Sequence, residues 1–306
     1  MADEQVQGEG QVQQTEEAGG FLDLLHKKAK IKSTDGQERV RQAVETLAQQ
    51  ALKDATLISD DAVSTIKAYI ARIDELLSEQ INHILHHAEF QKLEGAWRGL
   101  HHLVNNTESD DQLKIRVMNI SKKDLSKTLK KYKGAMWDQS PIFKKVYEEE
   151  YGRFGGEPYG CLVGDYHFDH TGPDVELLGE LSKIASAAHA PFIAGASPDL
   201  FKMDTFQELS NPVSLSKIFQ DPSYAAWNSL RSTEDAKYVS LALPQFLSRR
   251  PYGAKSEPVE EFEFEEDTGP GDHGKYTWSN SDYAMSVNIN RAFKEFGWCA
   301  KIRGVE

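Results

Sequence analysis

The strongest constraint on the fold of this chain is a run of apolar residues between positions 63 and 84. They recur at intervals of three and four residues, at Val63, Ile66, Ile70, Ile73, Leu77, Ile81 and Ile84. This spacing predicts a long amphipathic helix, which either a helical bundle or an isolated coiled coil would explain. Residues 93–104 continue the pattern after a short connection, which favours bundle packing. We therefore predict a helical domain over residues 37–107.

The segment before this domain has a different composition. Residues 1–20 contain five acidic residues, no Lys or Arg and almost no apolar side chains, so we predict a disordered acidic tail. Residues 21–32 follow as a tethered amphipathic helix, with lysines near its carboxyl end. The amino terminus lacks the basic start and apolar core of a secretory signal, and the chain has no apolar run long enough to cross a bilayer. We expect a cytoplasmic protein with no direct membrane insertion.

From residue 112 onward, strand patterns alternate with helix patterns. The predicted strands are Leu113–Val117, Tyr159–Val163, Phe192–Ala196 and Tyr238–Leu243. Predicted helices begin at the Ser121 and Asp124 capping box and at Ser140-Pro141, cover Val175–Ala188, and follow Ser197-Pro198 and Asp221-Pro222. A last helix is predicted from Trp278 to Trp298, followed by a strand-like segment at Cys299–Ile302.

Strands that alternate with helices imply a mostly parallel or mixed sheet covered by helices. The predicted class is therefore α/β (α+β), in which an N-terminal helical region precedes an α/β domain over residues 112–306. This domain looks incomplete, because the chain stops four residues after the last strand-like segment. An acidic, aromatic loop or edge ribbon is expected at residues 257–274, directly after the basic turn Arg249–Gly253. That turn could equally form a salt bridge to another protein or bind nothing.

The charge distribution bears on the class of partner. The chain has 35 basic and 48 acidic residues, a net charge of −13, and residues 1–20 and 257–267 account for twelve of the excess acids. The rest of the chain is close to neutral, which is compatible with dense assembly. The deficit of clustered cations argues against nucleic acid as a partner.

The best candidate for catalysis is the cluster Asp165, His167, Asp169 and His170. Two histidines and two carboxylates could bind a divalent ion, which makes a metal-dependent hydrolase the alternative function. The sequence offers no clear set of further ligands, so hydrogen-bonding residues at the end of a strand are the simpler interpretation.

Other candidate sites have weaker patterns. Five histidines could meet across two helices, but no acid or thiol completes a metal site; they are His83, His86, His87, His101 and His102. The glycine-rich segment Gly152–Gly160 precedes a predicted strand, whereas a phosphate loop follows one. Cys161 and Cys299 lie among apolar or aromatic residues and are expected to be buried, reduced thiols. We therefore expect no enzyme activity, no cofactor and no metal.

Five segments together resemble one family, the large sheath subunit of type VI secretion systems (TssC/VipB). They are Glu89–Asn105, Phe154–Thr171, Ala188–Pro198, Leu247–Ala254 and Trp278–Trp298. They follow the family's order across nearly the whole chain. Members of the family continue beyond the position of Glu306, so this chain would lack the C-terminal part that supplies much of the inner sheath layer.

The resemblance implies a structural role and a set of partners. The chain would pair with the small sheath subunit TssB/VipA, and heterodimers would stack with other sheath heterodimers around the Hcp inner tube and on the baseplate. Contraction would propel the tube and its effectors. The AAA+ ATPase ClpV would recycle contracted sheath by binding the helix at residues 21–32. The implied ClpV-binding residues are Phe21, Leu22, Leu24, Leu25, Lys28, Ala29 and Ile31. If the resemblance is set aside, the same helix leaves another hypothesis open: the chain is only an adaptor that binds an AAA+ partner.

Overall fold

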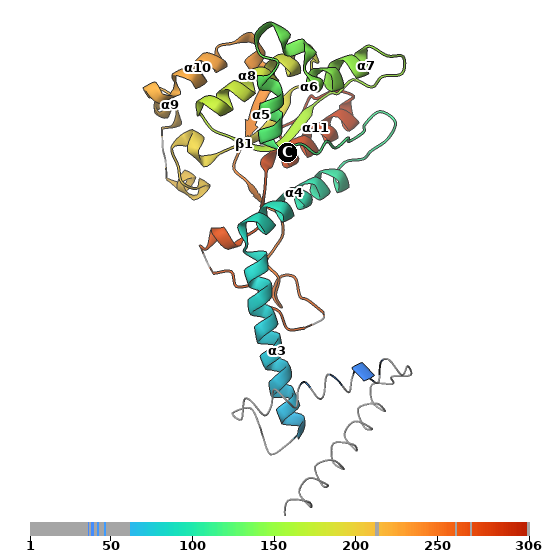
Figure 1. Cartoon of the computed structure of the whole chain (residues 1–306), viewed down its shortest axis with the longest axis vertical. Coiled ribbons are helices and arrows are strands. Elements are labelled where there is room, and N and C mark those ends of the chain that lie inside the picture. The colour runs from blue at the N-terminus through green and yellow to red at the C-terminus, as the bar shows by residue number, and fades with distance from the viewer. Residues whose placement is uncertain are drawn as a thin grey trace, which may run out of the picture. The chain divides into compact units, whose positions relative to one another are not determined.

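A computed structural model describes residues 62–304, apart from 212, 213, 261 and 270, together with 36, 38, 39, 42 and 46 (Figure 1). The chain divides into two compact units, one of residues 1–80 and 261–264 and the other of residues 81–260 and 265–306. The predicted acidic tail and the predicted helix at residues 21–32 lie outside the described residues. The domain boundaries drawn from the sequence stay predictions.

Two helices confirm the periodic pattern at residues 63–104. They are α3 (Ala62–Leu85) and α4 (Ala88–Asn105). However, Ile70, Ile73 and Leu77 of α3 are 51, 39 and 44% exposed, and the expected bundle packing around them is not found among the described residues. The periodicity of a sequence reports a helix with one apolar face, but it does not report what covers that face.

A three-stranded parallel sheet forms the centre of the second unit. Its strands are β1 (Leu162–Phe168), β2 (Phe192–Ala196) and β3 (Val239–Ala242), and their spatial order is the order of the sequence. The helix α8 (Gly172–Ala187) connects β1 to β2, and α10 (Ala225–Arg231) lies in the connection from β2 to β3. A separate antiparallel pair joins β4 (Phe246–Leu247) to β5 (Trp278–Ser279). The prediction of a mixed α/β fold is confirmed.

The helices α8 and α11 (Ser281–Phe296) both contact all three parallel strands (Figure 1). The helix α5 (Lys122–Lys130) lies against α8. The main core is formed by large side chains that are almost fully inaccessible to solvent, among them Phe168, Leu178, Ile184, Phe192 and Tyr224. A smaller core joins Leu103 of α4 to Tyr283 and Val287 of α11. Every residue of β2 is buried, as the uninterrupted apolar run of a central parallel strand predicts.

Two predicted serine caps are confirmed. The Ser121 hydroxyl accepts a hydrogen bond from the Asp124 backbone N–H at the start of α5, and the Ser140 hydroxyl accepts one from the Phe143 N–H, both over 3.1 Å. Ser140 starts a helical segment built from α6 (Pro141–Phe143), a wider π-turn at Lys144–Glu148 and α7 (Glu149–Tyr151). Shorter elements complete the described chain: helical turns at Gly134–Gln139, Pro198–Phe201, Phe206–Ser210, Pro222–Tyr224, Glu234–Tyr238 and His273–Lys275, and the one-turn helix α9 (Leu215–Ile218).

Several strand and burial predictions were wrong. Leu113–Val117 alternates like a strand but pairs with no strand in the described chain, and a strand needs a hydrogen-bonded neighbour as well as alternation. Cys299–Ile302 is also not a strand, because Gly297 ends α11 in the left-handed region at φ 73° and a turn follows. Cys161 and Cys299 are free thiols, but Cys161 is only half-buried and Cys299 is exposed. The strand predicted at Tyr159–Val163 begins at Leu162 and runs on to Phe168.

Candidate assembly surfaces

The most tightly organised polar site of the second unit is centred on Arg249, which follows β4. Its guanidinium donates to Glu94 of α4 over 2.7 Å and to Glu266 over 2.6 and 3.1 Å. The side chains of Arg249 and Glu266 are only 3 and 1% exposed. We call Glu94, Arg98, Arg249, Tyr252 and Glu266 the arginine node. It joins α4 to two segments that lie more than 150 residues later in the chain.

Each charge in the node has several partners. Glu94 also accepts from Arg98 over 2.7 Å and from the Thr277 hydroxyl over 2.9 Å, and Glu266 also accepts from the Tyr252 N–H over 2.9 Å. The Arg249 guanidinium lies over the Tyr252 ring, 4.4 Å from its centroid. Burial costs a charge less when hydrogen bonds of this kind satisfy it. The basic turn therefore forms a salt bridge within its own chain, an outcome the sequence did not predict.

The protonation of the node follows from the same contacts. Burial by itself raises the pKa of Glu94, but hydrogen bonds from Arg249, Arg98 and Thr277 outweigh it and lower this pKa below its ordinary value. Burial likewise acts to lower the pKa of Arg249, and its hydrogen bonds to Glu266 and Glu94 raise it overall. Both shifts favour the charged forms, so Glu94 and Arg249 are ionised at neutral pH and form a permanent ion pair.

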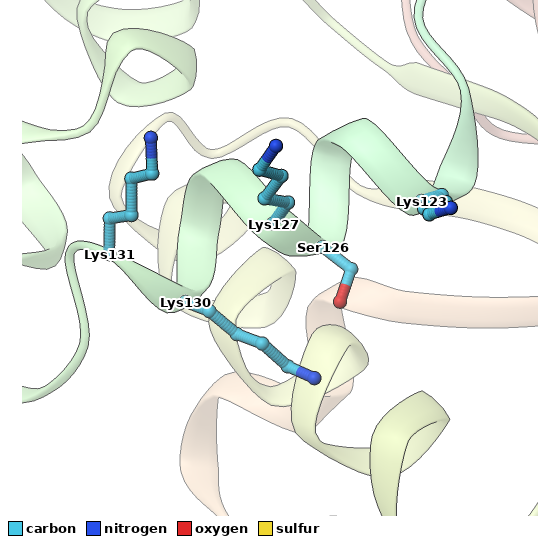
Figure 2. A pocket seen from close by; sticks show the side chains of 5 residues that line it. All are labelled: Lys123, Ser126, Lys127, Lys130 and Lys131. Carbon is cyan, nitrogen blue, oxygen red and sulfur yellow. The ribbon is translucent and has the colours of Figure 1, made fainter.

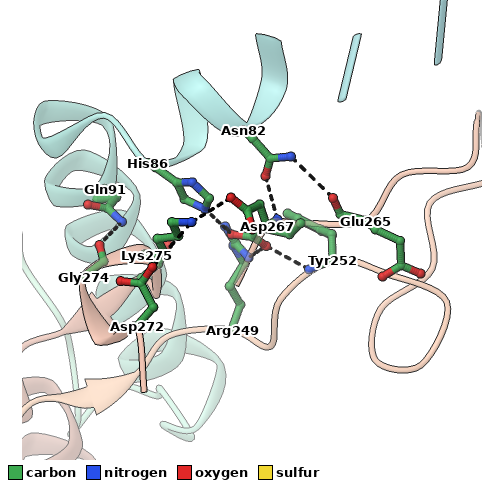
Figure 3. Close-up of polar contacts among 12 residues, drawn as sticks. Asn82, His86, Gln91, Arg249, Tyr252, Glu265, Asp267, Asp272, Gly274 and Lys275 are labelled. Atoms are coloured by element: carbon green, nitrogen blue, oxygen red, sulfur yellow. Dashed lines mark hydrogen bonds and ion pairs between the residues drawn. The ribbon is translucent and has the colours of Figure 1, made fainter. Parts of the chain in front are cut away.

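Further contacts fasten the segment after Glu265 to the junction of α3 and α4 (Figure 3). The Asn82 amide donates to the Glu265 carbonyl over 3.4 Å and accepts from the Asp267 N–H over 2.9 Å. Gln91 donates to the Gly274 carbonyl over 2.9 Å, and Lys275 pairs with Asp267 over 2.6 Å. The later part of the predicted acidic loop, from Glu265 to Gly274, is therefore held against α3 and α4 by hydrogen bonds.

Two glycines allow α4 to pack closely against β5 and α11. Gly95 and Gly99 of α4 are both buried, and a Cβ at Gly95 would lie 2.4 Å from the carbonyl oxygen of Trp278. A Cβ at Gly99 would lie 2.4 Å from the ring of Tyr283. Only glycine lets α4 approach β5 and α11 so closely.

The opposite side of α4 carries exposed apolar side chains. Leu93, Trp97 and Val104 are 56, 65 and 45% exposed, and Trp298 after α11 is 67% exposed. Phe154, in the glycine-rich segment before β1, is exposed in full. Large exposed apolar side chains of this kind are typical of surfaces that contact other proteins.

The proposed metal cluster is not assembled. Asp165 and His167 lie within β1 and are exposed, whereas Asp169 accepts hydrogen bonds from the N–H and hydroxyl of Thr171. His170 stacks on the Tyr224 ring with centroids 4.1 Å apart. Among the residues that the structure describes, no group of three or more His, Cys, Asp or Glu side chains could hold a metal ion. Asp165 and His167 share one face of β1, because residues two apart in a strand point to the same side, whereas Asp169 and His170 lie in the turn after the strand and have partners of their own.

The helix histidines have separate surroundings. His101 and His102 contact the amides of Asn105 and Asn106, each four residues later. The His86 ring lies 3.5 Å from Glu266, beside the arginine node. These contacts agree with their interpretation as ordinary helix histidines.

The family model described as VipB, the EvpB/VC_A0108 tail sheath N-terminal domain, matches residues 67–306. The chain belongs to the VipB tail sheath family. It is also 62% identical over 292 residues to the type VI secretion system sheath protein TssC1 of Pseudomonas aeruginosa, an alignment that covers 95% of this chain and 59% of that relative. This VipB-family chain thus spans about 59% of the length of the curated relative that it matches.

The resemblance inferred from the five segments is confirmed, and two of the segments contribute residues to the node. The segments Glu89–Asn105 and Leu247–Ala254 of this VipB-family chain contain Glu94 and Arg249, which the node brings together. The sequence shows Glu94 within one segment and an arginine pair before a proline in the other, but nothing in the spacing indicated that they meet. The predicted ClpV-binding residues, Phe21 to Ile31, lie outside the described residues. No helix in the described part of the chain is long and apolar enough to cross a membrane.

Proposed function

We propose that this chain is a structural subunit of the contractile sheath of a type VI secretion system and that it works in the cytoplasm without a catalytic centre. The observation that carries the proposal is the 62% identity to a type VI secretion sheath protein along 95% of the chain. Identity at that level along nearly the whole chain supports a shared fold for the matched part.

The arrangement of the second unit supports an architectural role. The arginine node and the two glycine contacts fix α4 rigidly against β5 and α11, and the same helix presents Leu93, Trp97 and Val104 to the outside. A rigid support beneath exposed apolar side chains is the design expected of a surface that bears load between subunits.

The partners in this proposal are the small sheath subunit TssB/VipA, other sheath heterodimers, the Hcp tube and the baseplate. Contraction of the assembled sheath would propel the tube. ClpV would recycle contracted sheath through Phe21, Leu24, Leu25 and neighbouring residues, whose helical spacing suits an amphipathic helix that binds in a groove.

Coexpression with the small sheath subunit tests the proposal. This chain and a version extended to the length of TssC1 are each purified through a tag on the small subunit, and the products are examined by negative-stain electron microscopy. We expect hollow cylinders from the extended version. Failure of both versions to copurify with the small subunit would overturn the proposal.

A second experiment tests the recycling segment. The double substitution Leu24→Glu and Leu25→Glu places charge on the apolar side of the predicted helix, so it should abolish binding of ClpV to the chain. His26→Ala, one position further on, lies on the other side by helical spacing and should leave binding intact. Equal binding by both variants in a pull-down would show that ClpV engages another segment.

A further inference from the structure

The exposed face of α5 carries a row of lysines. Leu125 and Leu129 are buried on the inner face, and three lysines recur every four residues on the outer face. Residues four apart lie on the same side of a helix, so these side chains form one row about 12 Å long. We call Lys123, Lys127 and Lys131 the lysine row. With Ser126 and Lys130 they line a shallow hollow in the surface (Figure 2).

The lysines beside this row are paired with acids of α8. Lys122 binds Asp174 over 2.7 Å, and Glu176 lies 3.6 Å from Lys130. Asp124, the acid within α5, accepts a hydrogen bond from the hydroxyl of the helix cap over 2.7 Å. In the part of the chain that the structure describes, the lysine row takes part in no ion pair. Like charges four residues apart destabilise a helix, so the row keeps an electrostatic cost that carboxylates would remove.

The chemistry of α5 indicates which ligand the lysine row suits. The helix α8 already presents carboxylates to the neighbouring lysines, and a helix with acids every four residues would present the same groups to the row at matching spacing. The segment Lys122–Lys130, described in full, contains no aromatic residue on which bases could stack and no arginine to hold a phosphate by two hydrogen bonds. Its exposed residues are polar, so this described helix offers no apolar side chain to a membrane.

We propose that the lysine row binds an acidic helix of a different protein in the sheath, one that presents carboxylates about four residues apart. The inference rests on the proposed function, because the sheath supplies the partner. A net charge of −13 repels a second copy of this chain, a nucleic acid and an anionic membrane alike over long range. A partner whose acids are confined to one segment keeps the local attraction without that repulsion.

A peptide of defined geometry tests the contact in the full chain. The probe is an alanine-rich helix of about 17 residues with three glutamates four residues apart, and its isomer carries the same glutamates distributed around the helix. Fluorescence anisotropy measures binding at about 0.01 M salt, where screening is weak. One exposed ion pair is worth a factor of about two to five, so Lys123→Gln, Lys127→Gln and Lys131→Gln together should raise the Kd of the probe about tenfold.

Two controls separate spacing and position from charge alone. The isomer should bind the wild-type chain several-fold more weakly than the probe, because only some of its glutamates can reach the row at once. Lys144→Gln, Lys145→Gln and Lys217→Gln together remove the same charge at exposed lysines outside the row, and this variant should bind the probe like the wild type. Circular dichroism verifies that both variants are folded.

Carbodiimide crosslinking tests the same contact within the assembly. The reagent activates a carboxylate, and a lysine in contact with it forms an amide as the activating group leaves as a urea. The version extended to the length of TssC1 is copurified with the small sheath subunit, crosslinked and mapped by mass spectrometry. We expect crosslinks from the lysine row to acids three or four residues apart in a helix of the small subunit.

Several outcomes would overturn the contact. They are equal binding of the probe by the wild type and the row variant, equal binding of probe and isomer, and crosslinks from the row that are absent or reach only a second copy of this chain. RNA or phosphatidylserine vesicles that bind the wild type and not the row variant, while the probe binds neither, would assign the row to phosphates.

The proposed function is judged separately. Hollow cylinders without crosslinks from the row would refute the contact alone. Failure of both versions to copurify with the small subunit would refute the function, whereas binding of the probe is measured without the small subunit and judges the row by itself.

Discussion

Replacing Arg249 by Met should strongly destabilise the second unit. The change removes the guanidinium from two carboxylates whose side chains are 10 and 1% exposed, with hydrogen bonds of 2.7, 2.6 and 3.1 Å. Removal of one member of a buried ion pair costs about 3–5 kcal/mol, because the other charge stays buried. Glu94 keeps Arg98 and Thr277, and Met can still pack on Tyr252, so we expect a loss of about 3 kcal/mol in the free energy of unfolding.

Urea unfolding followed by tryptophan fluorescence measures this loss. All five tryptophans lie between residues 97 and 298, within the second unit, so the signal reports on the unit that contains the node. Arg250→Met is the matched control, since Arg250 is exposed, and should change stability by less than about 0.5 kcal/mol. Equal effects of the two substitutions would refute the role assigned to the node.

The difference in unfolding free energy between the wild type and Arg249→Met should depend on pH. The pKa of Glu94 is lowered in the folded chain, so its ionised form stabilises the fold above the ordinary value of 4.5, and this contribution is lost as the pH falls through the folded pKa. The difference between wild type and Arg249→Met should therefore shrink in acid. A difference that stays constant down to about pH 3 would contradict the electrostatic explanation.

Three further substitutions test other parts of the fold by the same urea assay. Gly95→Ala should cost about 1–3 kcal/mol, because its Cβ would lie 2.4 Å from the Trp278 carbonyl, whereas Gly172→Ala, with open space around it, should not destabilise the chain. Burial and the nearby charge of Asp165 raise the pKa of the buried Asp282 from 3.8 to about 8, so stability should fall as the pH rises through that interval, and Asp282→Asn should remove this fall. Ser140→Ala removes a buried cap and should cost about 1 kcal/mol; no measurable loss would show that the cap is dispensable.

The sequence predicted best where local rules act alone. The Ser121 and Ser140 caps and the strand Phe192–Ala196 depend on neighbouring residues and on an unbroken apolar run, and all three were located correctly. The sequence could not predict the node, because Glu94 and Arg249 are 155 residues apart and only the fold brings them together. The sequence also wrongly predicted a strand at Leu113–Val117, where alternation is present but no neighbouring strand pairs with it in the described chain.

The candidate assembly surfaces likewise could be predicted only in part from the sequence. Resemblance located the family, but the exposed apolar face of α4 could be recognised only from the three-dimensional arrangement. Lys122, Lys130 and Lys133 look in the sequence like part of an ordinary lysine-rich helix, and only the structure shows that they pair with Asp174 and Glu176.

The long separation within the node has a consequence for synthesis of the protein in the cell. The chain is made from its amino terminus at about 5–20 residues per second, so Glu94 leaves the ribosome roughly 8–30 s before Arg249, 155 residues later. During that interval α4 lacks Arg249, and neither β5 nor α11 is present to cover Gly95 and Gly99. The inner face of α4 therefore stays uncovered until the last quarter of the described chain has been synthesised. Nascent chains stalled before residue 249 should bind chaperones through α4, and those released after residue 298 should not.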